Sequence, residues 1–209
     1  MLTGVIDYGA GNLRSVCNAL SMLKAEHKLV KDPSDLDGID ALIFPGVGAF
    51  GDSMENLEAQ KLADPIREWA TADRPFLGIC IGYQLLFEGS EESPETPGLG
   101  VFKGQVKRFS KESKLKIPHM GWNNLKVMDP SDSLWNELPK SPFVYFVHSF
   151  FPCPEDEKLV SSTCKHGETF AASIRSGNIT ATQFHPEKSQ SVGLQLIRNF
   201  LNSATVSVS

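Results

Sequence analysis

The stretch of sequence that decides the fold is Gly78-Ile79-Cys80-Ile81-Gly82. A short apolar segment, Pro75-Phe76-Leu77, leads into it, and a helix-like run, Tyr83-Gln84-Leu85-Leu86-Phe87, follows it. Glycines two positions before and after a nucleophile form the pattern of a nucleophile elbow, here with sulfur in place of a hydroxyl. Because glycine lacks a Cβ, the sharp turn from strand to helix closes without a clash. We therefore predict a strained, exposed Cys80 at the N-terminus of a helix that stabilises its thiolate.

A second informative segment, Phe184-His185-Pro186-Glu187, lies far along the chain. A cysteine, a histidine and a carboxylate in this order are the parts of a thiol acyl-transfer site. A strand predicted over 179–183 carries His185 to its carboxyl end, where parallel sheets bind ligands. Glu187 is expected to orient the imidazole through its second ring nitrogen. The sequence thus predicts a catalytic triad of Cys80, His185 and Glu187.

The remaining pattern predicts an α/β protein. In the first half, short apolar runs at 2–7, 28–31, 41–44 and 75–80 alternate with helix-like stretches at 12–22, 53–60 and 64–72. Such alternation favours a mostly parallel sheet flanked by helices on both faces. The second half reads as strands at 104–109, 124–127, 143–147, 159–163, 170–175 and 179–183, with a closing helix at 193–201. We expect one domain over 1–202 with an added antiparallel portion, and a frayed tail over 203–209.

Composition excludes several classes of protein. The net charge is −5, so strong binding to nucleic acid or to an anionic membrane is not indicated. No apolar run approaches the roughly 20 residues of a membrane span. The first residues read as a strand and lack the basic segment of a signal peptide, so a cytoplasmic location is expected. Four cysteines make no disulfide framework, and Cys153, Cys164 and His166 match no common zinc spacing. We expect neither a metal nor another cofactor.

The glycine-rich stretch 46–51 matches G-x-G-x-x-G, the fingerprint of dinucleotide binding. That fingerprint belongs in the first strand-to-helix turn, where this chain has Arg14 at the third glycine position. The strand after Gly51 also ends at Cys80 and not at an acidic residue. We interpret these glycines as a segment that presents backbone N–H groups to a developing oxyanion.

Assembled, these features resemble the class I glutamine amidotransferases, which carry Cys-His-Glu triads. More specific stretches resemble the glutaminase subunits of this family that serve histidine biosynthesis, and the resemblance covers nearly the whole chain. They are 7–13, 45–50, Pro118-His119-Met120-Gly121-Trp122-Asn123, 145–150 and Gln183-Phe184-His185-Pro186-Glu187-Lys188-Ser189. The resemblance implies a flavodoxin-like fold.

The resemblance also implies roles for individual residues. Cys80 would attack the carboxamide of L-glutamine, His185 would transfer protons, and Glu187 would orient the imidazole. The backbone N–H groups of Val47 and Ile81 would form the oxyanion hole. Residues expected to bind glutamine are Gly48, Gln84, Glu92, Ser149 and Phe150. Residues expected at a subunit interface are Trp122, Asn123, Tyr145 and Lys188, with Tyr145 near Lys188 if strands 143–147 and 179–183 are neighbours.

A partner protein follows from the same resemblance, because a glutaminase domain of 209 residues leaves no room for a synthase. The implied partner is a (β/α)8-barrel cyclase, with which the chain would form a heterodimer. The cyclase would use the ammonia to make imidazole glycerol phosphate and an aminoimidazole carboxamide ribotide in L-histidine biosynthesis. Two alternatives stay open: the glutaminase of anthranilate or aminodeoxychorismate synthase, and a catalytically silent regulatory subunit. One departure is Tyr83, where these glutaminase subunits more often have Met and other amidotransferases have His; its side chain is expected to point away from the thiol.

Overall fold

The architecture is a central sheet covered by helices on both faces. The computed structural model describes residues 1–9, 12–110 and 115–208, with side chains up to 205. Within these residues, an eight-stranded sheet has the order β2-β1-β3-β4-β13-β12-β11-β8. Its first five strands run parallel, and β12, β11 and β8 follow, each antiparallel to the strand before it in that order. The predicted α/β fold, with its antiparallel portion in the second half, is confirmed.

The elements have the following bounds. The strands are β1 Leu2–Ile6, β2 Glu26–Val30, β3 Ala41–Gly46, β4 Phe76–Cys80, β5 Gly89–Ser90, β6 Gly104–Arg108, β7 His119–Asn124, β8 Lys126–Val127, β9 Phe143–His148, β10 Phe150–Pro154, β11 Val160–His166, β12 Glu168–Ser176 and β13 Ile179–Thr182. The α-helices are α1 Leu13–Met22, α2 Phe50–Ala59, α3 Ala63–Thr71, α4 Ile81–Gln84 and α5 Gln190–Val208. Short 3-10 helices are η1 Pro33–Leu36, η2 Ser133–Trp135, η3 Glu157–Leu159 and η4 Pro186–Lys188.

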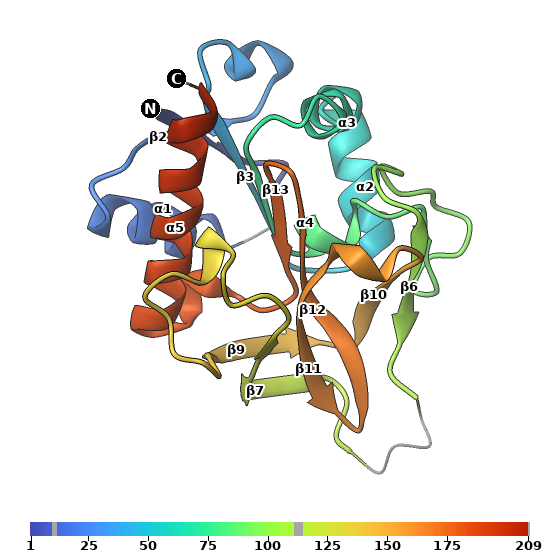
Figure 1. The fold of residues 1–209 in the computed structure, drawn as a ribbon. Helices are drawn as coiled ribbons and strands as arrows, with labels where there is room; N and C mark the ends of the chain where they lie inside the picture. The colour runs from blue at the N-terminus through green and yellow to red at the C-terminus, as the bar shows by residue number, and fades with distance from the viewer. Residues whose placement is uncertain (10–11, 111–114, 209) are drawn as a thin grey trace.

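Two hydrophobic cores fill the space between the sheet and its helices. Figure 1 shows α1 and α5 on one side of the sheet and α2 and α3 on the other. The first core packs Leu20 of α1 and Phe200 of α5 against Ile43 and Leu77 of the sheet. The second packs side chains of α2 and α3, such as Leu57 and Trp69, against the opposite face. Strands β3 and β4 are buried on both faces, as expected for the centre of a parallel sheet.

Two small sheets lie beside the main one. Strands β7 and β9 form an antiparallel ribbon in which His119 faces His148 and Trp122 faces Tyr145. Strands β10, β6 and β5 form a three-stranded sheet. In Figure 1 the ribbon lies below the carboxyl ends of β3, β4 and β13. It therefore lies at the edge of the sheet where an α/β protein binds its ligands.

Some expected elements differ in the structure. Helix α4 is a single turn, and the predicted helix at 83–87 does not continue past Gln84. The carbonyls of residues 85–88 instead accept backbone N–H groups of residues 98–102. Strands β7 and β10 were not predicted; β10 contains two prolines, which an edge strand tolerates. Strand β9 pairs with β7 and not with β13, which lies between β4 and β12.

The closing helix is longer than predicted. Helix α5 continues to Val208, through most of the tail that was expected to be frayed. Ala204 is buried in the first core, and the hydroxyl of Thr205 donates to the carbonyl of Leu201, so packing and hydrogen bonding extend the helix. Ser209, and Ala10 and Gly11 of the first glycine-rich turn, lie outside the described residues. In the part of the chain that is described, no helix has the length and apolar character needed to cross a membrane.

Candidate active site

Cys80 ends strand β4 in a strained backbone conformation, with φ 56° and ψ −106°. A non-glycine residue at positive φ costs about 1–3 kcal/mol and is concentrated at functional sites. The two flanking glycines serve close packing. A Cβ at Gly82 would lie 1.9 Å from the carbonyl oxygen of Phe44, and one at Gly78 would lie 2.9 Å from that of Gly82. The turn predicted from the glycine spacing is therefore formed, with the strain carried by Cys80 itself. The prediction that Cys80 is exposed is wrong, because the residue is only 5% exposed.

His185 and Glu187 lie just beyond the carboxyl end of β13. Nδ1 of His185 and Oε1 of Glu187 are 2.8 Å apart, and both side chains are 1% exposed. Burial alone would lower the pKa of His185, but the Cys80 thiolate and the Glu187 carboxylate raise it to about 10. The imidazole is therefore charged at neutral pH and forms an ion pair with Glu187. Helix α4 is only one turn long, so it offers Cys80 little of the helix dipole expected from the sequence.

Nε2 of His185 and Oε2 of Glu187 are buried and have no hydrogen-bond partner among the described residues. With Nδ1 held by Glu187, Nε2 is the ring nitrogen left for the thiol and the reacting groups. The amide of Gln183 also contacts the thiol, with its Nε2 3.7 Å from Sγ of Cys80. Sequence reasoning assigned no role to Gln183, because an uncharged side chain two residues before a histidine carries no pattern of its own.

A cavity of about 260 Å³ opens at Cys80. This volume is just below the roughly 300–1,000 Å³ of typical small-molecule pockets, so it suits a ligand of amino-acid size. Every residue predicted for the oxyanion hole or for glutamine binding lines this cavity. They are Val47, Gly48, Ile81, Gln84, Glu92, Ser149 and Phe150, joined by Pro118, Val147 and His148.

Two of the lining side chains are held in place by the backbone. Nε2 of Gln84 donates to the carbonyl of Phe150 and to Oε1 of Gln183, both at 3.1 Å. Oε1 of Gln84 is buried without a partner in the described part of the structure. Oε2 of Glu92 accepts the N–H of Phe50 at 2.8 Å and thereby caps helix α2. A buried amide oxygen without a partner and a fixed carboxylate thus belong to two residues that line a cavity next to a nucleophile.

The glycine-rich segment borders the cavity at the end of β3. Gly46 pairs with Cys80, and a Cβ at Gly46 would lie 2.5 Å from the hydroxyl of Tyr8. Gly48 has φ +114°, a conformation that favours glycine, although the space around it is open. The segment therefore combines a crowded glycine at the strand end with a conformationally adaptable one beside the thiol.

The predicted interface residues lie outside the cavity. Trp122 and Tyr145 face each other across the ribbon, with ring centroids 6.0 Å apart. Trp122 also stacks on Phe143 at 5.5 Å. The backbone N–H of His185 donates to the carbonyl of Tyr145 at 2.9 Å, so Tyr145 lies beside η4 and Lys188 although β9 is no neighbour of β13.

The fold and the nucleophile at its elbow agree with a comparison against protein families. Residues 4–204 match the model of glutamine amidotransferase class-I, and the chain belongs to this family. Comparison with curated relatives shows which members of this family the chain is similar to. The chain is 50% identical over 198 residues to imidazole glycerol phosphate synthase subunit HisH of Thermosynechococcus vestitus, covering 94% of each chain. It is 49% identical to the protein of the same name from Synechococcus sp. (strain JA-3-3Ab), over 94% of this chain and 91% of the relative.

Solved structures support the fold. One, described as the crystal structure of glutamine amidotransferase, superposes with a TM-score of 0.74 at 26% identity over 97% of this chain and 98% of that one. Another, PurLQS from Thermotoga maritima, gives a TM-score of 0.74 at 22% identity over 96% of this chain and 97% of that one. The second is too distant in sequence to indicate more than the fold.

Proposed function

We propose that this chain hydrolyses L-glutamine and passes the ammonia to a (β/α)8-barrel cyclase, as the glutaminase subunit of imidazole glycerol phosphate synthase in histidine biosynthesis. The observation that carries the proposal is the Cys80 thiol, which lines a cavity together with Gln84 and Glu92 and lies next to the buried pair of His185 and Glu187. Each of these groups has a role in the binding or the hydrolysis of glutamine. We assign the enzyme to the cytoplasm.

The first step forms a thioester. The thiolate of Cys80 attacks the side-chain amide carbon of glutamine, and the carbonyl oxygen becomes an oxyanion. His185, already protonated beside the thiolate, gives its proton to the amide nitrogen. The carbon–nitrogen bond then breaks, ammonia leaves, and the glutamyl group stays on sulfur. Glu187 holds the imidazole in the orientation that directs Nε2 to the leaving group.

The second step releases glutamate. The neutral imidazole of His185 takes a proton from water, and the resulting hydroxide attacks the thioester carbon. Collapse of that intermediate breaks the carbon–sulfur bond and restores the thiolate beside the protonated imidazole. The two steps together consume one glutamine and one water and form one glutamate, one ammonia and one proton, which the new carboxyl group releases.

Two side chains match the ends of the substrate. Glu92 provides a carboxylate for the α-ammonium group of glutamine, while its Oε2 remains bound to the backbone of Phe50. Oε1 of Gln84 accepts an N–H of the substrate, which would satisfy an acceptor that is otherwise buried without a partner. Ser149, Phe150 and Gly48 complete the wall around the ligand.

The oxyanion hole is assigned to the backbone N–H groups of Val47 and Ile81. Loss of one oxyanion donor typically costs about 100- to 1,000-fold in rate. A rotation of the peptide at Val47, allowed by the neighbouring Gly48, would therefore be a sufficient switch between idle and active enzyme. We expect weak glutaminase activity in the isolated chain and strong activation when the cyclase is present with its ligand.

The partner is assigned to the face that carries the β7–β9 ribbon. Met120, Trp122 and Phe143 are 62%, 38% and 47% exposed, which gives this face an apolar surface of the kind found at interfaces. Lys188 follows the triad in η4 and forms no salt bridge within the described residues. We expect Lys188→Ala to weaken glutamine-dependent synthesis while synthesis from free ammonium stays near normal. Equal wild-type values for both would remove Lys188 from the interface.

The deciding experiment measures glutamate release by wild type and by Cys80→Ala, each with and without the cyclase and its ligand. We expect Cys80→Ala to lose several orders of magnitude in rate while still co-purifying with the cyclase. An electrophilic glutamine analogue should label only Cys80, because burial raises the pKa of Cys17, Cys153 and Cys164, the last to about 12. Substantial activity in Cys80→Ala, or labelling of another cysteine, would refute the assignment.

A further inference from the structure

Two buried histidines lie next to the active-site cavity and have no part in the triad. His119 and His148 face each other in the β7–β9 ribbon and are 4% and 6% exposed. Nδ1 of His119 lies 3.1 Å from Nε2 of His148. His148 itself lines the cavity that opens at Cys80.

The contacts of the pair fix which nitrogens carry protons. Nδ1 of His148 is 2.8 Å from the carbonyl oxygen of Phe150, which only accepts, so this nitrogen is protonated. In a neutral ring, Nε2 of His148 is then an acceptor, and Nδ1 of His119 must donate to it. Nε2 of His119 is in turn an acceptor for the side-chain amide of Asn123 at 3.3 Å. Asn123, His119, His148 and Phe150 thus form a hydrogen-bond chain. In each of its hydrogen bonds, the acceptor is the group nearer to Phe150 in the series.

The surroundings keep both rings neutral and fixed. Burial, with the charge that His166 carries when protonated, lowers the pKa of His119 to about 4. Burial, against the raising effect of the Phe150 carbonyl, lowers the pKa of His148 to about 3. The ring of His119 is stacked between Phe146 at 4.6 Å and His166 at 4.1 Å. Aromatic packing thus limits the rotation of the His119 ring, which connects Asn123 to His148 in the hydrogen-bond chain.

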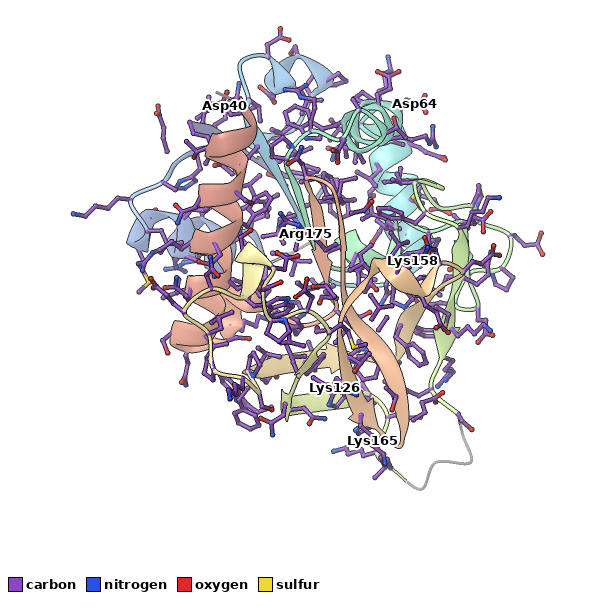
Figure 2. The ribbon with its side chains drawn as sticks, in the orientation of Figure 1. Asp40, Asp64, Lys126, Lys158, Lys165 and Arg175 are labelled. Carbon is purple, nitrogen blue, oxygen red and sulfur yellow. The ribbon has the colours of Figure 1, made fainter. Side chains whose placement is uncertain are left out.

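The two ends of this hydrogen-bond chain lie in different parts of the molecule. At one end, the Phe150 carbonyl also accepts Nε2 of Gln84, the residue whose free Oε1 is available to glutamine. At the other end, Asn123 lies on the ribbon one residue from the exposed Trp122. Its amide also donates to the carbonyl of Lys165 at 3.0 Å. Figure 2 shows Lys165 at the far end of the β11–β12 hairpin, away from the helical layers.

We propose that His119 and His148 are positioning residues for glutamine. As a neutral pair, they hold the Phe150 carbonyl, and with it the amide of Gln84, at a fixed position relative to the β7–β9 ribbon. The inference rests on the proposed function, because it names what the pair positions. It goes further by linking the glutamine subsite to the face assigned to the partner. A shift of the ribbon on partner binding reaches the subsite through this chain.

The test uses pairs of variants in the complex with the cyclase. In asparagine, Nδ2 is separated from Cβ by the same two bonds as Nδ1 of histidine, so His148→Asn keeps the donor to Phe150. His148→Leu keeps bulk and loses the donor. We expect His148→Leu to raise KM for glutamine about tenfold with a smaller change in kcat, and His148→Asn to stay within about threefold of wild type.

His119 is tested in the same way, with a matched control. His119→Leu leaves Nε2 of His148 without a donor, and we expect KM to rise about threefold; His119→Asn should restore the wild-type value. The control is His27→Leu, which removes a half-buried imidazole on β2 that bonds to the carbonyl of Ala25 and lies outside the hydrogen-bond chain. KM should not change in this control. A double variant His119→Leu with His148→Leu should be no worse than His148→Leu alone, because both act through Phe150.

Two further measurements separate positioning from mere stability. Nitrogen-15 spectra of the complex at pH 7 should show both rings neutral and protonated at Nδ1. Calorimetry in the Cys80→Ala background should show weaker glutamine binding for His148→Leu and near-normal binding for His148→Asn.

Each adverse result has its own meaning. If wild type hydrolyses glutamine and His148→Leu keeps KM and affinity within twofold, the positioning role is wrong and the proposed function stands. If both His148 variants lose thermal stability and activity equally, the role is structural and the proposal fails. A charged or Nε2-protonated His148 also overturns it. If wild type neither binds nor hydrolyses glutamine, the proposed function itself fails.

Discussion

The hydroxyl of Ser189 donates a hydrogen bond to the carbonyl oxygen of His185 across 2.7 Å. The same hydroxyl accepts the backbone N–H of Tyr145 at 3.0 Å, and the N–H of His185 donates to the carbonyl of Tyr145. Ser189 is fully buried, so no solvent replaces these bonds. Its single hydroxyl therefore ties the triad histidine to the strand that carries a predicted interface residue.

Removing this hydroxyl should impair catalysis more than substrate binding. In Ser189→Ala, an N–H and a carbonyl lose a buried partner, which costs about 1–3 kcal/mol of stability. Because His185 is held by its backbone as well as by Glu187, we expect kcat to fall about tenfold with KM little changed. Steady-state kinetics of the complex and urea unfolding measure the two effects.

Ser191→Ala serves as the matched control for Ser189→Ala. Ser191 is exposed on the first turn of α5, and among the described residues its hydroxyl forms no hydrogen bond with the triad segment. Its removal should leave kcat and unfolding free energy near wild type. If Ser189→Ala behaved like this control, the segment 185–188 would be held without the hydroxyl.

The contact between Gly82 and Phe44 leads to a second prediction. A Cβ at position 82 would overlap the backbone carbonyl of Phe44 at 1.9 Å, and both residues are buried, Gly82 in α4 and Phe44 in the central strand β3. We expect Gly82→Ala to destabilise the protein by more than about 3 kcal/mol or to prevent folding, as overpacking of a core does at its upper range. Expression level and thermal unfolding provide the measurement.

The control for Gly82→Ala is Gly89→Ala. There the nearest atom to a new Cβ is Oε1 of Gln105 at 3.0 Å, the end of a flexible side chain that turns away cheaply. This variant should unfold within about 1 kcal/mol of wild type. A stable and active Gly82→Ala would show that the elbow tolerates a backbone shift that its packing argues against.

The elbow around Cys80 shows which features of the fold can be predicted from the sequence and which cannot. Gly78, Cys80 and Gly82 are close in the chain, and their spacing is enough to predict a turn that lifts a thiol out of the sheet. The partner of Gly82 is Phe44, and nothing in the sequence identifies that contact. Likewise, the carbonyls of residues 85–88, just after α4, accept backbone N–H groups from residues between 98 and 102. Such a pairing between distant segments leaves no local signal.

The candidate site also contains residues that were predicted from the sequence and residues that were not. Its residues for glutamine binding and for the oxyanion hole were predicted from the resemblance to a family, and they gather around one cavity. The pair of His119 and His148 was not predicted, because it depends on the register of the β7–β9 ribbon. Strand β7 contains Gly121 and two asparagines, residue types that are rare in strands. Its pairing with β9 overrides that poor propensity.

The two neutral histidines predict sensitivity to acid. Each has a pKa lowered by burial, to about 4 for His119 and about 3 for His148, from an unfolded value near 6.5. Below pH 6.5 the unfolded chain binds protons that the folded chain refuses, so stability is full above 6.5 and is lost as the pH falls. Each group contributes up to about 1.4 kcal/mol per pH unit. Urea unfolding between pH 7 and pH 4 measures the slope.

His119→Asn should reduce this acid slope by about one proton, since it removes one titrating ring and keeps the donor to His148. His27→Asn is the control, because it removes a half-buried imidazole on β2 and retains both buried rings of the ribbon. Its slope should match wild type. A slope in His119→Asn equal to that of wild type would mean that His119 is already charged in the folded protein.

Tyr83 combines full burial with a hydroxyl that has no hydrogen-bond partner among the described residues. Its ring packs edge-on against Phe87 in the second core, at a centroid distance of 5.6 Å. An unsatisfied buried hydroxyl costs about 1–3 kcal/mol, whereas phenylalanine keeps the ring and its contacts. We expect Tyr83→Phe to raise the free energy of unfolding by about 1 kcal/mol and to leave glutamine kinetics unchanged. Denaturant unfolding and steady-state kinetics on one preparation give both values. A loss of stability would mean that the hydroxyl is satisfied by a buried water, and a change in KM would mean that this departure from the family acts on the glutamine subsite.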